Sequence, residues 1–242
     1  MSSASGAAPF YAYTSLEAPP GAPNLACLTV HYTPDGKYLL STSPSSLVTL
    51  YNPSIERVSR PIQCYGCHQQ SCPVVDVSVM VGNSHFASTG LNGPYRDCTV
   101  LIHDVTRSGV TPDKLGQKNA DVPSGVRKIN SRVGHTPPLG FLEVPGVAAV
   151  ELAPQGNVLF TGGYDGKVLA WDLKQGNGSS MSVCVGNGVA DVKYFDGRVV
   201  VGRTDGEVDV YDCRFNKCCL EKYSVEGKPA LTKLQLLRDQ VR

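Results

Sequence analysis

The sequence lacks most of the features that mark membrane, secreted and nucleic-acid-binding proteins. Only one of its 242 residues is Trp and three are Met, and the formal net charge is +1. A balanced charge gives no general attraction to nucleic acid or to an anionic membrane. No apolar run reaches the roughly 18 residues of a spanning helix, and residues 1–24 contain neither the basic nor the apolar region of a secretory signal. We therefore expect an intracellular protein that contacts neither membranes nor nucleic acid directly.

Cysteine is not scarce, but its number argues against a disulfide framework. There are nine cysteines, an odd number, and no secretory signal accompanies them. Disulfides form mainly in secreted proteins, and buried free cysteines behave as small apolar residues. We expect reduced thiols in a reducing compartment.

Glycine and proline are abundant, at 25 and 17 residues, which is typical of a β protein with many turns. The clearest stretch is Leu159–Leu173, LFTGGYDGKVLAWDL. Asp165-Gly166 lies between two apolar runs, and Asp-Gly is a strong signal for a tight turn in a hairpin. After the turn the side chains alternate with a period of two, as in a half-buried strand. The stretch therefore predicts an antiparallel hairpin.

The same order of strands and turns recurs, which gives four copies. The third strand of each copy ends near Tyr51, His103, Trp171 or Tyr211, and these positions are separated by 52, 68 and 40 residues. The strands expected outside Leu159–Leu173 are residues 27–31, 38–42, 47–51, 74–81, 84–89, 99–104, 126–130, 189–195, 198–202, 207–212 and 218–224.

The repeats predict an all-β fold of stacked sheets. A sheet of three or four strands cannot bury both faces alone, and radial stacking buries them and protects the edges. We expect a β-propeller over residues 25–242, although the periodicity alone also allows a β-sandwich. Residues 1–24 are expected to be a disordered arm rich in Pro, Ala and Ser, and residues 106–125 a polar insertion. Leu231–Val241 is the main candidate for an amphipathic helix, with a strand-like tail as the alternative.

The hairpin also resembles the end of a WD40 repeat, whose blade closes on a Trp-Asp dipeptide. The resemblance covers about residues 25–225. It implies a buried, hydrogen-bonded set that satisfies polar groups inside a blade and takes no part in catalysis. The residues that match this set are His135, Thr161, Asp165 and Trp171 in the third copy, and Asp205 and Tyr211 in the fourth.

The resemblance further implies where partners bind. In this family, residues just before the turn acids contact other proteins, and the matching positions here are Tyr164 and Thr204, with Arg203 adjacent. Tyr and Arg are enriched among the residues that dominate binding energy at protein interfaces.

The number of copies leads to an expectation about assembly. WD40 propellers commonly have seven blades, and at about 40 residues each the missing three would need roughly 120 more residues. Four recognisable blades imply an open propeller closed by a partner, a small ring or a shortened relative. An open sheet edge promotes aggregation unless it is covered. We therefore expect an obligate or near-obligate complex with other protein subunits.

Two stretches are similar to a particular subgroup of the family. They are TPDGKYLLSTSPSSLVTLYN at residues 33–52 and TVLIHD at 99–104. The subgroup is the small WD-repeat subunit shared by COMPASS-type histone methyltransferase complexes and by transcription-termination complexes that contain the PNUTS–PP1 phosphatase. The similarity implies a non-catalytic scaffold, in the nucleus rather than the cytoplasm, linked to chromatin modification or transcription termination. The spacing of the copies and the insertion depart from that subgroup.

One cysteine-rich motif offers an alternative function. Cys64, Cys67 and His68 form the C-x-x-C-H string of c-type haem attachment, and Cys72 extends it to the ligand types of a zinc site. The alternatives are a metal- or haem-binding propeller and a loop of reduced thiols. The lack of an export signal favours the thiols, and we expect no cofactor. Because no G-x-S-x-G or other nucleophile–base pattern occurs, we also expect no enzymatic activity.

Overall fold

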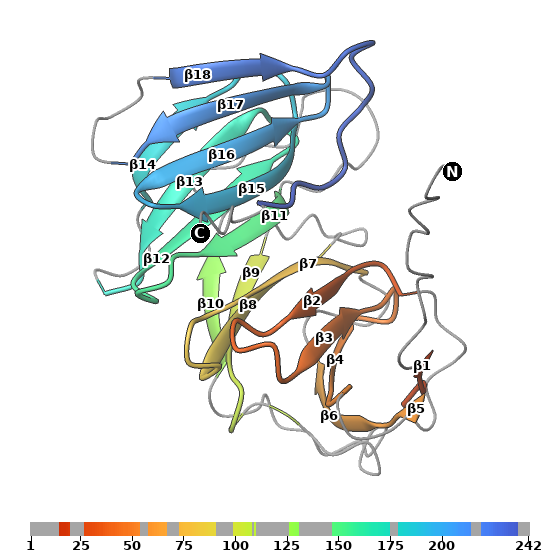
Figure 1. The fold of residues 1–242 in the computed structure, drawn as a ribbon. Coiled ribbons are helices and arrows are strands. Elements are labelled where there is room, and N and C mark those ends of the chain that lie inside the picture. Colours follow the sequence, from red (N-terminus) through yellow and green to blue (C-terminus); the bar gives the residue numbers. More distant parts are fainter. Residues whose placement is uncertain are drawn as a thin grey trace, which may run out of the picture.

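The fold is all-β. The computed structural model describes residues 15–19, 27–53, 58–66, 73–90, 99–107, 109, 126–130, 147–174, 179–213 and 219–236. In these ranges the chain forms the 18 strands β1 to β18 (Figure 1). The described ranges contain no helix with the length and apolar character needed to cross a membrane.

Sixteen of the strands form four antiparallel sheets of four strands each, which we call the first to fourth blades. In each blade the strands follow one another in chain order from the inner strand outward. The first blade is β2 (Val30–Tyr32), β3 (Leu39–Thr42), β4 (Leu47–Tyr51) and β6 (Pro61–Gly66). The second is β7 (Val74–Val79), β8 (His85–Gly90), β9 (Thr99–Asp104) and β10 (Val126–Asn130). The third is β11 (Val147–Leu152), β12 (Val158–Gly163), β13 (Lys167–Asp172) and β14 (Ser179–Cys184). The fourth is β15 (Val189–Phe195), β16 (Arg198–Arg203), β17 (Glu207–Asp212) and β18 (Cys219–Ser224).

Tight turns join the strands as the sequence predicts. Asp196 and Gly197 link β15 to β16 and both have positive φ, 45° and 75°. Two positive φ angles match the right-handed twist of the flanking strands, which is why Asp-Gly is favoured there. The predicted turns at Asp165-Gly166 and Asp205-Gly206 join β12 to β13 and β16 to β17.

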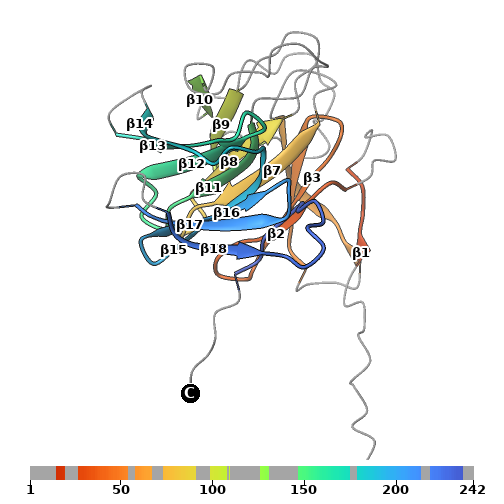
Figure 2. The ribbon, with the colours of Figure 1, turned by 90° about the horizontal axis from the view of Figure 1, so that it is seen from above.

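The blades pack face to face in chain order. Strand β11 contacts β7 and β8 on one side and β15 on the other, and β3 contacts β7 (Figures 1 and 2). Between blades the cores are apolar, and Trp171, Tyr65 and Phe86 are the largest fully buried side chains. The prediction of a propeller of about four blades is confirmed.

All four blades share one register. The strand-end aromatic residues predicted from the sequence face equivalent residues of the second strand, in the pairs Leu39–Tyr51, Phe86–His103, Leu159–Trp171 and Val199–Tyr211. Counting from these pairs gives each inner-strand residue its equivalents in the other blades. Val30, Val77, Val150 and Val192 are equivalent in this sense.

At both ends of the chain the structure differs from what the sequence predicts. Part of the predicted arm is described, and β1 (Ser15–Leu16) pairs in parallel with β5 (Val58–Ser59) beside the first blade. The predicted helix Leu231–Val241 is wrong over its described part, because residues 231–236 contain no helix. They run instead along the fourth blade toward the middle of the molecule (Figure 1). Most of the predicted insertion at 106–125 lies outside the described residues.

Candidate functional site

The space between the fourth blade and the first is open and lined by apolar side chains. Val30 on the inner strand of the first blade is 48% exposed, whereas its equivalents Val77, Val150 and Val192 are all 0% exposed. Tyr32, two residues further on, is 60% exposed. A neighbouring blade covers this face of the inner strand in the second, third and fourth blades. The inner strand of the first blade has no such cover among the described residues.

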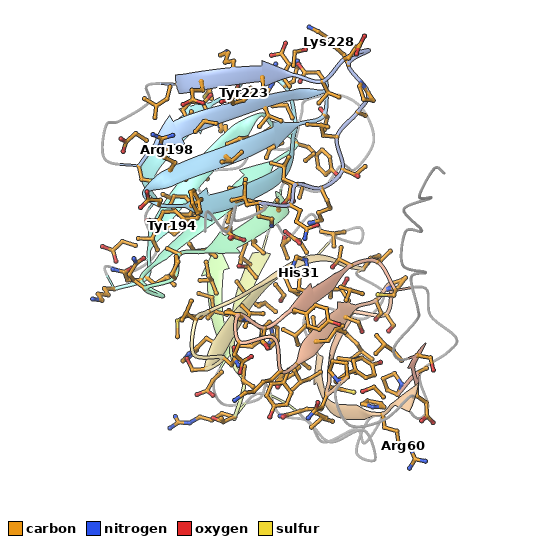
Figure 3. The ribbon with its side chains drawn as sticks, viewed as in Figure 1. His31, Arg60, Tyr194, Arg198, Tyr223 and Lys228 are labelled. Carbon is orange, nitrogen blue, oxygen red and sulfur yellow. The ribbon has the colours of Figure 1, made fainter. Side chains whose placement is uncertain are left out.

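This open side contains a groove of about 740 Å³. The groove is lined by residues 28–32 of the first blade, by residues 191 and 193–195 of β15, by residues 233–236, and by Glu151 of β11. Figure 3 shows His31 on the inner side of the first blade, facing the other blades. The groove therefore reaches from the surface to the middle of the molecule.

At the inner end of the groove, Asp76 is the centre of a charged cluster. Its Oδ1 lies 2.6 Å from Lys233 Nζ and 3.3 Å from His31 Nε2, and its Oδ2 accepts a hydrogen bond from the Val150 amide at 3.0 Å. Burial alone would raise the pKa of Asp76, but the hydrogen bond from His31 and the charges of Lys233 and Lys193 lower it to about 2. The carboxylate is thus charged, fully buried and paired.

A second buried pair lies beside it. Lys193 Nζ is 3.5 Å from Glu151 Oε2 and 3.4 Å from Asp191 Oδ1. Burial disfavours the ammonium of Lys193, but the carboxylates of Glu151 and Asp191 outweigh it and raise the pKa. Burial also raises the pKa of Glu151. Sequence reasoning did not predict this cluster, although Asp76 and Asp191 occupy equivalent positions of the inner strands β7 and β15.

The predicted structural set is partly described. In the third blade Trp171 Nε1 donates a hydrogen bond of 2.9 Å to Thr161 Oγ1, and both side chains are buried. The second blade places His103 and Ser88 at the same positions, with Nε2 and Oγ 3.2 Å apart. His135 lies outside the described residues. Asp165 accepts a hydrogen bond from the Lys167 amide at 3.2 Å, which holds the turn.

In the fourth blade other residues form the corresponding side-chain hydrogen bond. Val201 stands where the third blade has Thr161, so the hydroxyl of Tyr211 donates instead to Asp209 Oδ2 at 3.3 Å. Burial and the neighbouring Asp209 carboxylate raise the pKa of Tyr211.

Changing Thr161 to valine should destabilise the chain by about 1–3 kcal/mol, because the buried indole N–H of Trp171 loses its acceptor. Urea unfolding of the single and double variants measures this. In the Trp171→Phe background the T161V change should cost much less, because no donor remains to be satisfied. Equal costs in both backgrounds would show that the hydrogen bond contributes nothing.

The predicted partner-contact residues differ in accessibility. Tyr164 is 39% exposed, whereas Arg203 is only 8% exposed. The Arg203 guanidinium lies 2.6 Å from Asp205 and 2.8 Å from Glu207. Arg203 therefore ties the predicted turn acid to β17, and Tyr164 offers more surface to a partner. The Thr204 amide donates to the Gly188 carbonyl at 2.8 Å, which places this turn beside the entry to β15.

The cysteine motif is only partly described. Cys64 lies in β6, fully buried, and burial raises the pKa of its thiol. Cys67, His68 and Cys72 lie outside the described residues, so the alternative of a metal or haem site is not tested. Among the described residues no three His, Cys, Asp or Glu side chains group as metal ligands.

Comparison with known proteins identifies one repeat. Residues 136–172 match the family model described as WD domain, G-beta repeat. No curated protein matches the chain significantly. The matched residues include β11, β12 and β13, the strands that carry Thr161 and Trp171. Residues 136–172 therefore match a WD40 repeat, and the described residues have the fold of a WD40-type β-propeller with about four blades.

Proposed function

We propose that the chain is a non-catalytic scaffold subunit of a multiprotein complex, and that a protein partner covers the open side between the fourth and first blades. One observation carries the proposal: Val30 is 48% exposed where its three equivalents are fully buried. WD40 repeats commonly mediate contacts between proteins, which agrees with this use of the open side.

The energetics favour a bound state. Leu28, Val30 and Tyr32 are 43%, 48% and 60% exposed. Val30 and Tyr32 lie on β2, and Leu28 is two residues before it. Burying a large apolar side chain contributes about 1.5–3 kcal/mol, and contiguous exposed apolar surface marks interaction sites. A partner that covers these three side chains gains several kcal/mol, which supports an obligate or near-obligate complex.

The finer proposal concerns the kind of complex. The similarity of residues 33–52 and 99–104 to the small subunit of histone methyltransferase and transcription-termination assemblies supports a nuclear role. The +1 net charge supports recruitment through protein contacts rather than through nucleic acid. Tyr164 and Thr204 provide a second contact region, on the turns that join the second and third strands of the third and fourth blades.

Changing Tyr32 to serine should weaken capture of the partner by about tenfold or more, because a centrally placed Tyr commonly dominates interface energy. The measurement is a tagged pull-down from native cells at moderate salt, with stoichiometric co-purifying proteins identified by mass spectrometry. Tyr223→Ser is the matched control, because Tyr223 is similarly exposed, at 56%, but lies on β18, the outer strand of the fourth blade (Figure 3).

Each result of the pull-down has a defined meaning. A methyltransferase or phosphatase assembly supports the nuclear proposal, and another stable complex that Y32S loses keeps the scaffold alone. Equal capture by wild type, Y32S and Y223S contradicts the open side as the partner site. Recovery of a folded, stable monomer without partners contradicts the near-obligate complex.

A further inference from the structure

The described segment after the fourth blade, Leu231–Leu236, continues the repeat of inner strands. Val150 and Val192 are equivalent residues of β11 and β15, and 42 residues separate them. Another 42 residues lead from Val192 to Leu234. Aligned in this way, L-T-K-L-Q-L at 231–236 follows the apolar pattern of V-A-A-V-E-L in β11 and V-A-D-V-K-Y in β15.

The hydrogen bonding of the segment agrees with this alignment. In the second blade Asp76 Oδ2 accepts the amide N–H of Val150, which belongs to the inner strand of the next blade, at 3.0 Å. In the fourth blade Asp191 occupies the position of Asp76, and its Oδ2 accepts the amide N–H of Leu234 at 2.8 Å. Leu234 therefore has the same position relative to the fourth blade as Val150 has relative to the second blade.

The side-chain packing agrees as well. Gly162 of β12 and Gly202 of β16 are equivalent residues. A Cβ at Gly162 would lie 2.8 Å from Val192 of the next inner strand, and a Cβ at Gly202 would lie 3.0 Å from Leu234. The connection that leads into the segment also resembles the one before β15. The backbone of Lys228 and Pro229 passes close to Gly206, and in the same way the backbone of Gly186 and Asn187 passes close to Gly166.

Each ion at this point already has a partner of opposite charge, with the carboxylates of Asp76, Glu151 and Asp191 sharing two lysines. Lys233 stands where β7 and β15 have Asp76 and Asp191, and its Nζ lies 2.6 Å and 3.8 Å from their carboxylates. Lys193 is paired with Glu151 in the same way. Since every ion of the cluster has a partner, a molecule that enters the groove meets no unpaired charge. The exposed side chains of Val30, Tyr32 and Leu236 therefore favour an apolar occupant without charge.

The segment has a free edge. Among the described residues, no backbone group forms a hydrogen bond with the backbone of Leu231–Leu236. In contrast, the inner strand of each of the four blades pairs antiparallel with the second strand of the same blade. Leu236 is 37% exposed, and it lines the groove together with Val30 and Tyr32 of the first blade.

We propose that Leu231–Leu236 is the inner strand of an incomplete fifth blade, and that a neutral, apolar strand of a partner polypeptide pairs with it antiparallel as the second strand. This deepens the proposed function, on which it rests, because it states how the partner occupies the open side. Pairing by strand addition supplies main-chain hydrogen bonds, and the alternating side chains give specificity.

The existing blades indicate the residue types that the partner strand needs. Opposite the position of Lys233 they carry Thr89, Gly162 and Gly202, which lie against the next inner strand. Opposite the position of Leu236 they carry Phe86, Leu159 and Val199, all buried. The partner strand should therefore place a small residue opposite Lys233 and a large apolar residue opposite Leu236.

The test uses the full chain and a capped, fluorescein-labelled peptide with the sequence of residues 157–163, NVLFTGG, which has this pattern and no charge. Fluorescence polarisation should show saturable binding. A peptide with proline in place of Phe160 should bind at least about tenfold more weakly, because the Phe160 position faces the inner strand with its amide and proline removes this donor. Leu234→Asp in the chain should weaken binding by a similar factor, whereas Leu220→Asp, on the outer strand β18, should not change it.

A second measurement guards against misfolding of the L234D variant. In the wild-type chain the peptide should slow amide hydrogen exchange over residues 232–236 at least about tenfold. Absence of saturable binding, or equal binding to wild type and L234D, overturns the strand inference. If Y32S still loses its cellular partner in that case, the proposed scaffold function is kept and only the strand pairing is rejected.

Two other occupants of the groove give distinct results. A chain that sediments as a dimer, and that L234D converts to a monomer, identifies a second copy as the occupant. A variant lacking residues 1–14 that binds the peptide at least about tenfold more tightly than the full chain identifies its own arm. Either result overturns the assignment to a partner polypeptide.

Discussion

Replacing Asp76 with asparagine is expected to destabilise the protein by about 3 kcal/mol at neutral pH, because removing one partner of a buried ion pair leaves the other without its counter-charge. The side chain of Asp76 is 0% exposed and its carboxylate lies 2.6 Å from Lys233 Nζ. Asparagine can still accept the Val150 amide, so the change isolates the loss of charge. Urea unfolding followed by circular dichroism measures it.

The same variant tests the direction of the pH dependence. The folded-state pKa of Asp76 is lowered from 3.8 to about 2, so its contribution is fully present above about pH 4 and is lost as the pH falls toward 2. A lowering of this size corresponds to about 2 kcal/mol. Wild type should lose this stability between pH 4 and pH 2, and D76N should lack that part of the loss.

Two variants serve as controls for Asp76. Asp196→Asn changes an acid in the turn between β15 and β16, where asparagine accepts the same positive φ, and should alter stability by less than about 0.5 kcal/mol. Lys233→Met should reduce the cost of D76N, because the cation left without its partner is then absent. A D76N chain as stable as D196N would contradict the paired cluster.

Much of the architecture can be predicted because the turns and strands of each blade are specified by consecutive residues of the sequence. The Asp-Gly turns and the period-two alternation in residues 159–173 specify a hairpin without help from the rest of the chain. The strand-end residues Tyr51, His103, Trp171 and Tyr211 occupy one register in the structure, and the residue types before them allowed the four copies to be aligned.

The contacts of Asp76 in the central cluster could not be predicted from single copies, because His31 and Lys233 come from other parts of the chain. Asp76 and Lys233 are separated by 157 positions in the chain, and neither has a charged partner within its own strand. A signal did exist: the acids of V-V-D-V at 74–77 and V-A-D-V at 189–192 recur at one inner position. Read alone, each acid resembles an exposed residue of an alternating strand.

The tail was predicted as a helix, with a strand-like tail as the alternative, for a physical reason. Leu231, Leu234 and Leu237 recur every three residues, a spacing that fits a helix face. The same leucines fit the inner-strand pattern once the 42-residue repeat is counted. In the structure the Asp191 carboxylate binds the Leu234 amide and Gly202 leaves room for its side chain. Contacts with the fourth blade thus decide between two patterns that the local sequence allows.

Gly162→Ala and Gly202→Ala are expected to differ in effect although the two glycines are equivalent. At Gly162 a Cβ would lie 2.4 Å from Val189 and 2.8 Å from Val192, both fully buried in the packed fourth blade. Such overpacking costs about 1–3 kcal/mol or more, and we expect G162A to lose about 3 kcal/mol. Urea unfolding of both variants against wild type measures the difference.

At Gly202 the same methyl group meets a more compliant neighbour. The nearest atoms belong to the Leu234 side chain, at 3.0 to 3.3 Å, and Leu234 is only half-buried at the open side. Alanine also lowers the conformational entropy of the unfolded chain, so G202A should lie within about 0.5 kcal/mol of wild type. A G202A variant as unstable as G162A would mean that Leu231–Leu236 is packed as firmly as a complete blade. The smaller expected cost follows from a fifth inner strand that has no second strand behind it, which leaves the segment free to shift and to accept a partner.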